Sequence, residues 1–162
     1  DEQEAESPLW RIANQSVLAD LLMGLREHMV EPHDPNGQDL VAIMHETGMV
    51  QGQVLLSTNK VPPEDLAKYY NVADCTINIS DAEGFGLATL ESLSCGTPII
   101  VNMTGGLQEQ VTDGEDWFGV GIEPSSKAVI GSQDVPYIYE DRISKEDFHA
   151  ALKKTTNKCW IL

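Results

Sequence analysis

Residues 83–98, which read EGFGLATLESLSCGTP, decide how this chain folds. The run CTINIS at 75–80, in which apolar residues alternate, precedes them, and the apolar run IIV at 99–101 follows them. A strand, a glycine-bearing turn, a helix, a glycine stop and a second strand are the sequence form of a βαβ unit. We therefore predict strands at 75–80 and 99–101 and a helix over 87–95 that ends at Gly96.

The turn ahead of the predicted helix has the features of an anion-binding site. A helix N-terminus presents free backbone N–H groups and a positive dipole end, and Gly84 and Gly86 would let an anionic ligand approach closely. Glu83 lies at the mouth of the turn, and Glu91 lies deeper along the helix. A carboxylate that holds two hydroxyls is a common grip on a ribose. One helix face, at spacings of three and four, would carry Leu87, Leu90, Glu91 and Ser94.

The wider pattern resembles a known enzyme family. EGFGLATLE is similar to the paired-glutamate motif of retaining glycosyltransferases with two facing Rossmann-type domains (the GT-B fold), of the large group-1 or family 4 type. Three further segments stand in that family's order and spacing: PPEDLAKYYNVAD at 62–74, CGTP at 95–98, and TGGLQEQV at 104–111 with Asp113 and Gly114. The resemblance covers about residues 54–121. It implies the C-terminal, nucleotide-sugar-binding half of such an enzyme.

The resemblance also implies roles for single residues. Glu83 is expected to be the catalytic residue beside the donor sugar, and Glu91 is expected to hold the ribose. The other contacts to diphosphate and sugar are expected from Gly84, Phe85, Gly86, Leu87, Thr104, Gly105 and Gly106. Simpler roles stay open: Glu83 could be a turn acid that favours the helix N-terminus, Glu91 a solvated helix acid, and the glycines could serve only tight packing.

A second glycine-bearing loop follows the strand predicted at 99–101. Gly105 and Gly106 lie in this loop, and we expect their N–H groups to be exposed beside the first turn. Ligands of open α/β sheets bind at the carboxyl ends of the strands. Two glycine-bearing loops from adjacent strands therefore predict one shared crevice. A side chain in place of Gly86 is expected to block the approach of a diphosphate.

The whole chain reads as an α/β protein with a doubly wound, mostly parallel sheet. Its 162 residues, 41% hydrophobic and 22% charged, fit one domain. We predict an acidic, disordered end at 1–7 and a single Rossmann-like domain at 8–162. Further predicted elements are helices at 16–28, 38–47, 62–71 and 145–157 and a strand at 54–57. Residues 114–121 are expected to form a turn, and 124–139 an extended excursion without a clear period.

The charge of the chain limits its partners. A formal net charge of −16 argues against nucleic acid and anionic membrane surfaces as partners. It is also awkward for a nucleotide-sugar site, because one helix dipole contributes about 0.3–1 kcal/mol whereas micromolar binding needs about 8 kcal/mol. The family places an Arg–Lys pair in its first strand–helix connection. Here no clear opening strand precedes residues 16–28, and the basic residues before Glu83 are Arg11, Arg26, Lys60 and Lys68.

Several kinds of site are not expected. No apolar run of about eighteen residues and no secretory leader is present, so we predict no membrane-spanning segment. Cys75, Cys95 and Cys159 are odd in number and lack metal-ligand spacing, which indicates reduced thiols in a cytoplasmic protein. The histidines share no ligand spacing either. We therefore expect no metal and no cofactor, with a nucleotide diphosphate sugar as the substrate.

The predicted function is donor binding for transfer of a glycosyl group with retention of configuration. The family generally needs a second domain for the acceptor, so this chain alone should transfer little, and an acceptor-binding domain or subunit is a candidate partner. The alternative is a non-catalytic Rossmann-like module that acts through a protein partner. The net charge and the missing Arg–Lys pair favour that alternative, and the paired glutamates disfavour it. A sugar-nucleotide epimerase fits the motif less well.

Overall fold

The computed structural model describes residues 12–14, 39–48, 50, 61–134 and 136–156. The acidic end at 1–7, the predicted helix at 16–28 and the predicted strand at 54–57 lie outside these residues. The same is true of Arg11, Arg26, Lys60 and Cys159. The fold below is that of the described part of the chain.

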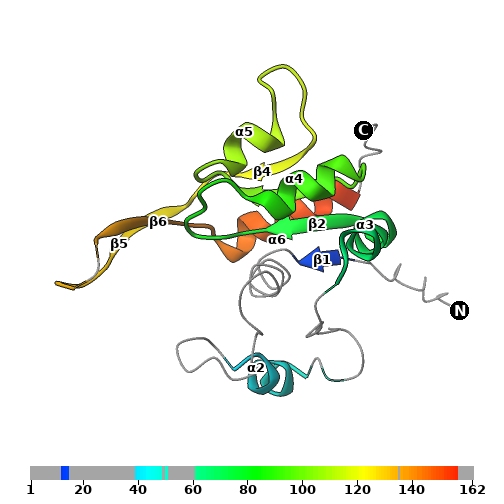
Figure 1. The fold of residues 1–162 in the computed structure, drawn as a ribbon. Coiled ribbons are helices and arrows are strands. Elements are labelled where there is room, and N and C mark those ends of the chain that lie inside the picture. Colours follow the sequence, from blue (N-terminus) through cyan, green and yellow to red (C-terminus); the bar gives the residue numbers. More distant parts are fainter. Residues whose placement is uncertain (1–11, 15–38, 49, 51–60, 135, 157–162) are drawn as a thin grey trace, which may run out of the picture.

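Four short parallel strands form the central sheet. They lie side by side in the order β1 (Ile12–Asn14), β2 (Cys75–Asn78), β3 (Ile99–Asn102) and β4 (Gly119–Ile122) (Figure 1). Ile77 of β2 pairs with Asn14 on one side and with Ile100 on the other. Every side chain of β2 and β3 is buried, which is typical of parallel strands covered on both faces. The predicted βαβ unit and the mostly parallel sheet are confirmed.

β1 corrects the expectation that no opening strand precedes residues 16–28. Ile12 pairs with Cys75 in parallel register, although the two residues are far apart in the sequence. A strand of three residues is too short to show an alternating pattern. Its partner, rather than its own composition, makes it a strand.

Helices cover both faces of the sheet, as expected for a doubly wound fold. α4 (Leu87–Ser94) and α5 (Leu107–Val111) lie on one face, and α6 (Lys145–Thr156) lies on the other. α3 (Pro63–Val72) packs against α4. α2 (Leu40–Glu46) has no buried residue. No helix in the described ranges has the length and apolar character that crossing a membrane requires.

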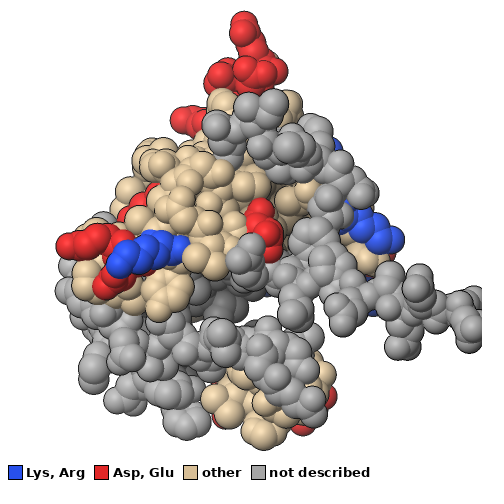
Figure 2. Space-filling view, turned by 90° about the vertical axis from the view of Figure 1, so that its right-hand side faces the viewer, with Lys and Arg blue, Asp and Glu red and all other residues tan. Residues whose placement is uncertain are grey.

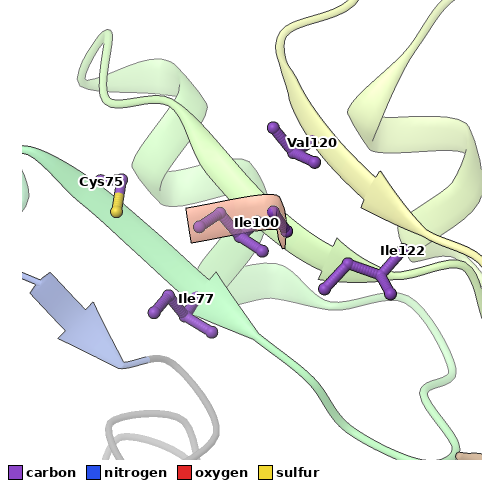
Figure 3. Close-up of a cluster of buried hydrophobic side chains, with 6 residues drawn as sticks. Cys75, Ile77, Ile100, Val120 and Ile122 are labelled. Carbon is purple, nitrogen blue, oxygen red and sulfur yellow. The ribbon is translucent and has the colours of Figure 1, made fainter. Parts of the chain in front are cut away.

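Successive residues of the central strands point to opposite faces of the sheet. Ile100 faces α6, where it meets Ile77 and Val120 from the neighbouring strands (Figure 3). Ile99 and Val101 pack on the other face, in the same cluster as the α5 side chains. Full burial of such a side chain stabilises the fold by about 1.5–3 kcal/mol. The core therefore holds the carboxyl ends of β2 and β3 in fixed register.

The buried face of α4 differs from the predicted one. Ala88, Thr89 and Ser92 are buried against the sheet, whereas Leu87 and Leu90 are exposed. The Ser92 hydroxyl lies 2.6 Å from that of Thr76 on β2. Small hydrogen-bonding side chains thus let α4 approach the strand closely. The prediction that placed the leucines with Glu91 along one face did not identify this buried face.

The helices predicted at 38–47, 62–71, 87–95 and 145–157 agree with α2, α3, α4 and α6 to within two residues at each end. The region after residue 113 needs correction. Gly96 adopts φ +74° just past α4, and the Ser144 hydroxyl caps α6 by accepting the Asp147 amide at 3.0 Å. Residues 114–121 are not wholly a turn, because β4 begins at Gly119. The described residues of 124–139, predicted to be an extended excursion, belong to an antiparallel hairpin. Its strands are β5 (Ser126–Ile130) and β6 (Ile138–Arg142), and it projects from the body (Figure 1).

Candidate functional site

Two loops at the carboxyl ends of β2 and β3 meet directly. The amide of Gly106 donates to the carbonyl of Gly84 at 3.1 Å. Gly105 lies so close to the first loop that an added Cβ would stand 1.7 Å from the carbonyl oxygen of Glu83. The glycine-bearing loops are thus neighbours, as predicted. Two hollows of about 440 and 490 Å³ lie elsewhere, one between β4 and α6 and one along α3.

The first loop delivers the chain to the start of α4. Gly86 is the N-cap residue, with φ +79° and ψ 56°, and no side chain caps the helix. Among the residues that the structure describes, the amides of Phe85, Gly86 and Leu87 have no hydrogen-bond acceptor. The side chains of Phe85 and Leu87 are 56% and 47% exposed. This end of α4 has the geometry that anion binding at a helix N-terminus requires.

The second loop, with Gly105 and Gly106, presents fewer free amides for a ligand than we expected. The Gly106 amide is already used by Gly84, so the prediction that it is open to a ligand is wrong. The Gln110 side-chain amide also donates to the carbonyl of Phe85, which further ties α5 to the first loop. Gly105 and Gly106 therefore act first in close packing between the loops.

Gly84 and Gly86 face different surroundings. A Cβ on Gly86 would lie 2.5 Å from Cδ2 of Leu107, a fully buried side chain of α5. A Cβ on Gly84 would meet no atom within 4 Å. The expectation that a side chain at Gly86 blocks a ligand is thus misplaced, since that side chain would point into the protein.

Glu83 and Glu91 are both half-buried, at the two ends of this region. The Tyr70 hydroxyl on α3 donates to Oε2 of Glu91 at 3.3 Å. Tyr70 is only 1% exposed, and its carbonyl accepts the Thr97 hydroxyl at 2.7 Å. Burial, followed by the nearby charge of Glu91, raises the pKa of Tyr70 far above its ordinary value. Glu91 is therefore held from the α3 side by Tyr70, a residue of the 62–74 segment for which the sequence analysis predicted no role.

Tyr70→Phe should destabilise the protein through this one contact. The ring stays buried while the hydrogen bond to Glu91 is lost, so we expect a loss of about 1 kcal/mol in the free energy of unfolding. Urea denaturation measures the change. Tyr69→Phe, at the 57% exposed neighbour, is the matched control and should be neutral. Equal stability of the two variants would show that the Tyr70–Glu91 contact contributes nothing.

Thr104 is only 4% exposed, and its side chain has a hydrogen-bond partner from the hairpin. Its hydroxyl donates to Oδ2 of Asp141 on β6 at 2.9 Å. The hydrogen bond from Thr104, followed by Lys127, holds the pKa of the Asp141 carboxyl below its ordinary value. Sequence reasoning missed Asp141, which comes 37 residues after Thr104. It lies beyond residues 54–121, the stretch that carries the motifs of the resemblance.

The charges around the site are mostly negative. Lys127 pairs with Asp141 at 3.2 Å, and Arg142 pairs with Glu140 at 2.5 Å and with Asp81 at 3.8 Å. The charges of both cations near the loops after β2 and β3 are therefore already paired with carboxylates. Acidic side chains also gather at the top of Figure 2, where the loop between α5 and β4 runs. That loop carries Asp113, Glu115 and Asp116.

The placement of possible metal ligands and of the thiols can be stated for the described part of the chain. Within it, no group of three or more His, Cys, Asp or Glu side chains could hold a metal ion. Cys75 and Cys95 are free thiols. Burial raises the pKa of the Cys75 thiol to about 11, so it is not a reactive thiolate near neutral pH.

The comparison with protein families decides the family. The family model for glycosyl transferases group 1 matches residues 46–155, a range that includes both glycine-bearing loops. The chain belongs to the glycosyltransferase group 1 family. This confirms the resemblance found in the motifs, and the α/β sheet is that of one Rossmann-like half of a GT-B fold.

Relatives of this glycosyltransferase chain are much longer than the matched segment. The D-inositol 3-phosphate glycosyltransferase of Thermomonospora curvata is 33% identical over 136 residues, which are 78% of this chain and 31% of the relative. That of Streptosporangium roseum is 32% identical over 115 residues, 68% of this chain and 26% of the relative. That of Acidothermus cellulolyticus is 47% identical over 69 residues, which are 42% of this chain and 15% of the relative. The chain thus spans less than a third of each.

Proposed function

We propose that this group 1 glycosyltransferase chain binds the nucleotide diphosphate sugar for a transfer that retains the anomeric configuration. One observation carries the proposal: the loops with EGFG and TGG lie in contact at the carboxyl ends of adjacent parallel strands. Open α/β sheets bind their ligands at that edge. Glu83 precedes the start of α4 beside this edge, and Glu91 lies one turn into the helix.

The proposed roles follow from the charges that transfer creates. As the glycosidic bond breaks, negative charge grows on the departing diphosphate, which the amides at the start of α4 would stabilise. Glu83 would position the donor sugar, and its charge would favour an oxocarbenium-like centre. Glu91, held by Tyr70, would accept hydrogen bonds from the ribose hydroxyls.

The acceptor side of the reaction lies outside this segment in our proposal. Less than a third of each compared relative matches this chain, so an acceptor-binding domain or subunit would supply the opposite wall. The relatives' names suggest D-inositol 3-phosphate as the first acceptor to test. We expect little transfer by this chain alone. A cytoplasmic location stays a prediction.

A non-catalytic module remains the second candidate. The formal charge of −16 favours it, and so do Lys127 and Arg142, which are already paired with carboxylates. An anionic ligand would have to enter beside these two cations, whose charges are already paired. Measured nucleotide binding separates the two candidates.

Titration calorimetry with UDP, GDP, ADP and their glucose conjugates tests the donor site. We expect micromolar binding of one nucleotide and loss of at least about tenfold in affinity for Glu91→Gln, because hydrogen bonds to a charged group contribute about 1.5–3 kcal/mol. The 2′-deoxy form of the bound nucleotide should lose affinity for the wild type and little more for the variant.

Glu64→Gln, at an exposed acid in the first turn of α3, is the control for the lost charge and should bind as the wild type does. If the wild type binds none of these nucleotides or nucleotide sugars, the non-catalytic module is favoured. Normal binding by Glu91→Gln would remove Glu91 from the ribose site while leaving donor binding in place.

A further inference from the structure

The β5–β6 hairpin touches the candidate site at its root. The hairpin leaves the body on the side where the strands of the sheet end, and its far end points away (Figure 1). Asp141, near the end of β6, contacts the loops after β2 and β3, and its neighbour Arg142 also pairs with Asp81. This strand lies outside the segment that carries the family motifs.

Asp141 uses its main chain and its side chain to join the two loops. Its amide donates to the carbonyl of Asp81, in the loop after β2, at 2.7 Å. Its carbonyl accepts the side-chain amide of Asn102, at the end of β3. Its carboxylate accepts the Thr104 hydroxyl at 2.9 Å. One residue thus holds segments that follow two different strands.

The surroundings of Asp141 indicate that this arrangement is tight. Asn102 is fully buried, and its amide also donates to the carbonyl of Ser80 at 2.9 Å. The Asp141 side chain is only 18% exposed and pairs with Lys127. Hydrogen bonds to a charged acceptor are stronger than those between neutral groups. The contact between Thr104 and Asp141 therefore constrains the loop.

The position of Asp141 matters because the two loops pack main chain against main chain where they meet, so neither can move independently. Thr104 directly precedes Gly105, which is in contact with the carbonyl of Glu83, and Asp81 stands two residues before Glu83. A small shift of either segment would therefore be transmitted to Glu83. Displacement of reacting groups by about 1 Å can reduce a rate by about a hundredfold.

We propose that Asp141 is a positioning residue of the donor site, which fixes the loop of Glu83 relative to the loop of Gly105. Donor binding then depends on the hairpin, which lies inside the matched family range of 46–155 but outside the motif stretch at 54–121. This inference rests on the proposed function. It adds a residue that neither the motif nor the comparisons assign.

Asp141→Ala should weaken binding of the nucleotide sugar about tenfold, equivalent to about 1.4 kcal/mol. The alanine leaves the Thr104 hydroxyl without its acceptor. Asp141→Asn should lose about twofold at most, because the amide oxygen can still accept that hydrogen bond. Asp134→Ala and Asp134→Asn make the same changes at an exposed aspartate between β5 and β6, and both should bind normally.

A double-mutant cycle separates positioning from a general loss of structure. Calorimetry on Asp141→Ala, Thr104→Val and the double variant should give losses that do not add, since each single change removes the same hydrogen bond. Additive losses would overturn the route through Thr104. Thermal unfolding of each variant shows whether it is folded. If Asp141→Ala does not fold, Asp141→Glu replaces it in the test. The longer side chain moves the carboxylate away from Thr104, so affinity should fall about fivefold.

The outcomes separate this inference from the proposed function. If the wild type binds no nucleotide or nucleotide sugar of the panel, the donor site itself is wrong and Asp141 has no role in it. If the wild type binds and folded Asp141→Ala or Asp141→Glu binds equally well, the inference fails alone. Selective loss in the Asp141 variants, with recovery in Asp141→Asn, supports it.

Discussion

Gly105→Ala should abolish nucleotide binding and destabilise the fold by roughly 3–5 kcal/mol, within the range of severe single substitutions. The added Cβ would lie 1.7 Å from the carbonyl oxygen of Glu83 and 2.9 Å from its carbonyl carbon. Both atoms belong to the main chain, so no change of rotamer relieves the clash. The glycine-bearing loops would have to separate. Urea denaturation and calorimetry with the bound nucleotide measure the two effects.

Gly96→Ala is the matched control for this substitution. Gly96 also has a positive φ, +74° against +49° at Gly105, but a Cβ there would meet no atom within 4 Å. The alanine should cost roughly 1–2 kcal/mol through the left-handed backbone alone. Nucleotide affinity should be unchanged. If Gly105→Ala behaves like Gly96→Ala, close packing of the two loops is not required for binding.

Gly84→Val should weaken diphosphate binding by at least about tenfold, which is about 1.4 kcal/mol. The stability of the variant should stay within about 0.5 kcal/mol of the wild type, as for most surface substitutions. The new side chain would extend into the open space in front of the loop, where our proposal has the ligand approach the amides of α4. Gly86→Val should behave in the opposite way. Its φ of +79° and its contact with Leu107 place the cost on folding.

Calorimetry and urea denaturation of both variants test this contrast. Binding loss without stability loss at Gly84, and stability loss at Gly86, would locate the ligand in front of the first loop. Normal nucleotide binding by Gly84→Val would show that the diphosphate approaches from another direction. The roles assigned to Phe85 and Leu87 would then fail as well.

Much of the βαβ unit around Glu83 could be predicted because its signals are local. Gly96 ends the helix through its own left-handed backbone, and Pro63 opens α3 through its fixed φ. Alternating and continuous apolar residues indicated β2 and β3. The same local reasoning chose the wrong face of α4, because the leucines are exposed and the small polar residues pack on β2.

Features that depend on distant partners could not be predicted. β1 exists as a strand because Cys75 and its neighbours pair with it, and Tyr70 meets Glu91 because α3 packs against α4. Asp141 reaches Thr104 only because the hairpin returns to the carboxyl edge of the sheet. None of these contacts leaves a pattern within one segment.

Backbone preferences and hydrophobic period, which act over a few residues, were thus enough to determine the βαβ unit and the glycine turns. The family was indicated by the resemblance of the motifs and shown by the family-model match. Which side chains support Glu91 and Thr104, and which way Gly84 and Gly86 face, depended on how separate segments pack. Packing and hydrogen bonding join residues that are close in space and remote in sequence, so those details were settled only when the chain had folded.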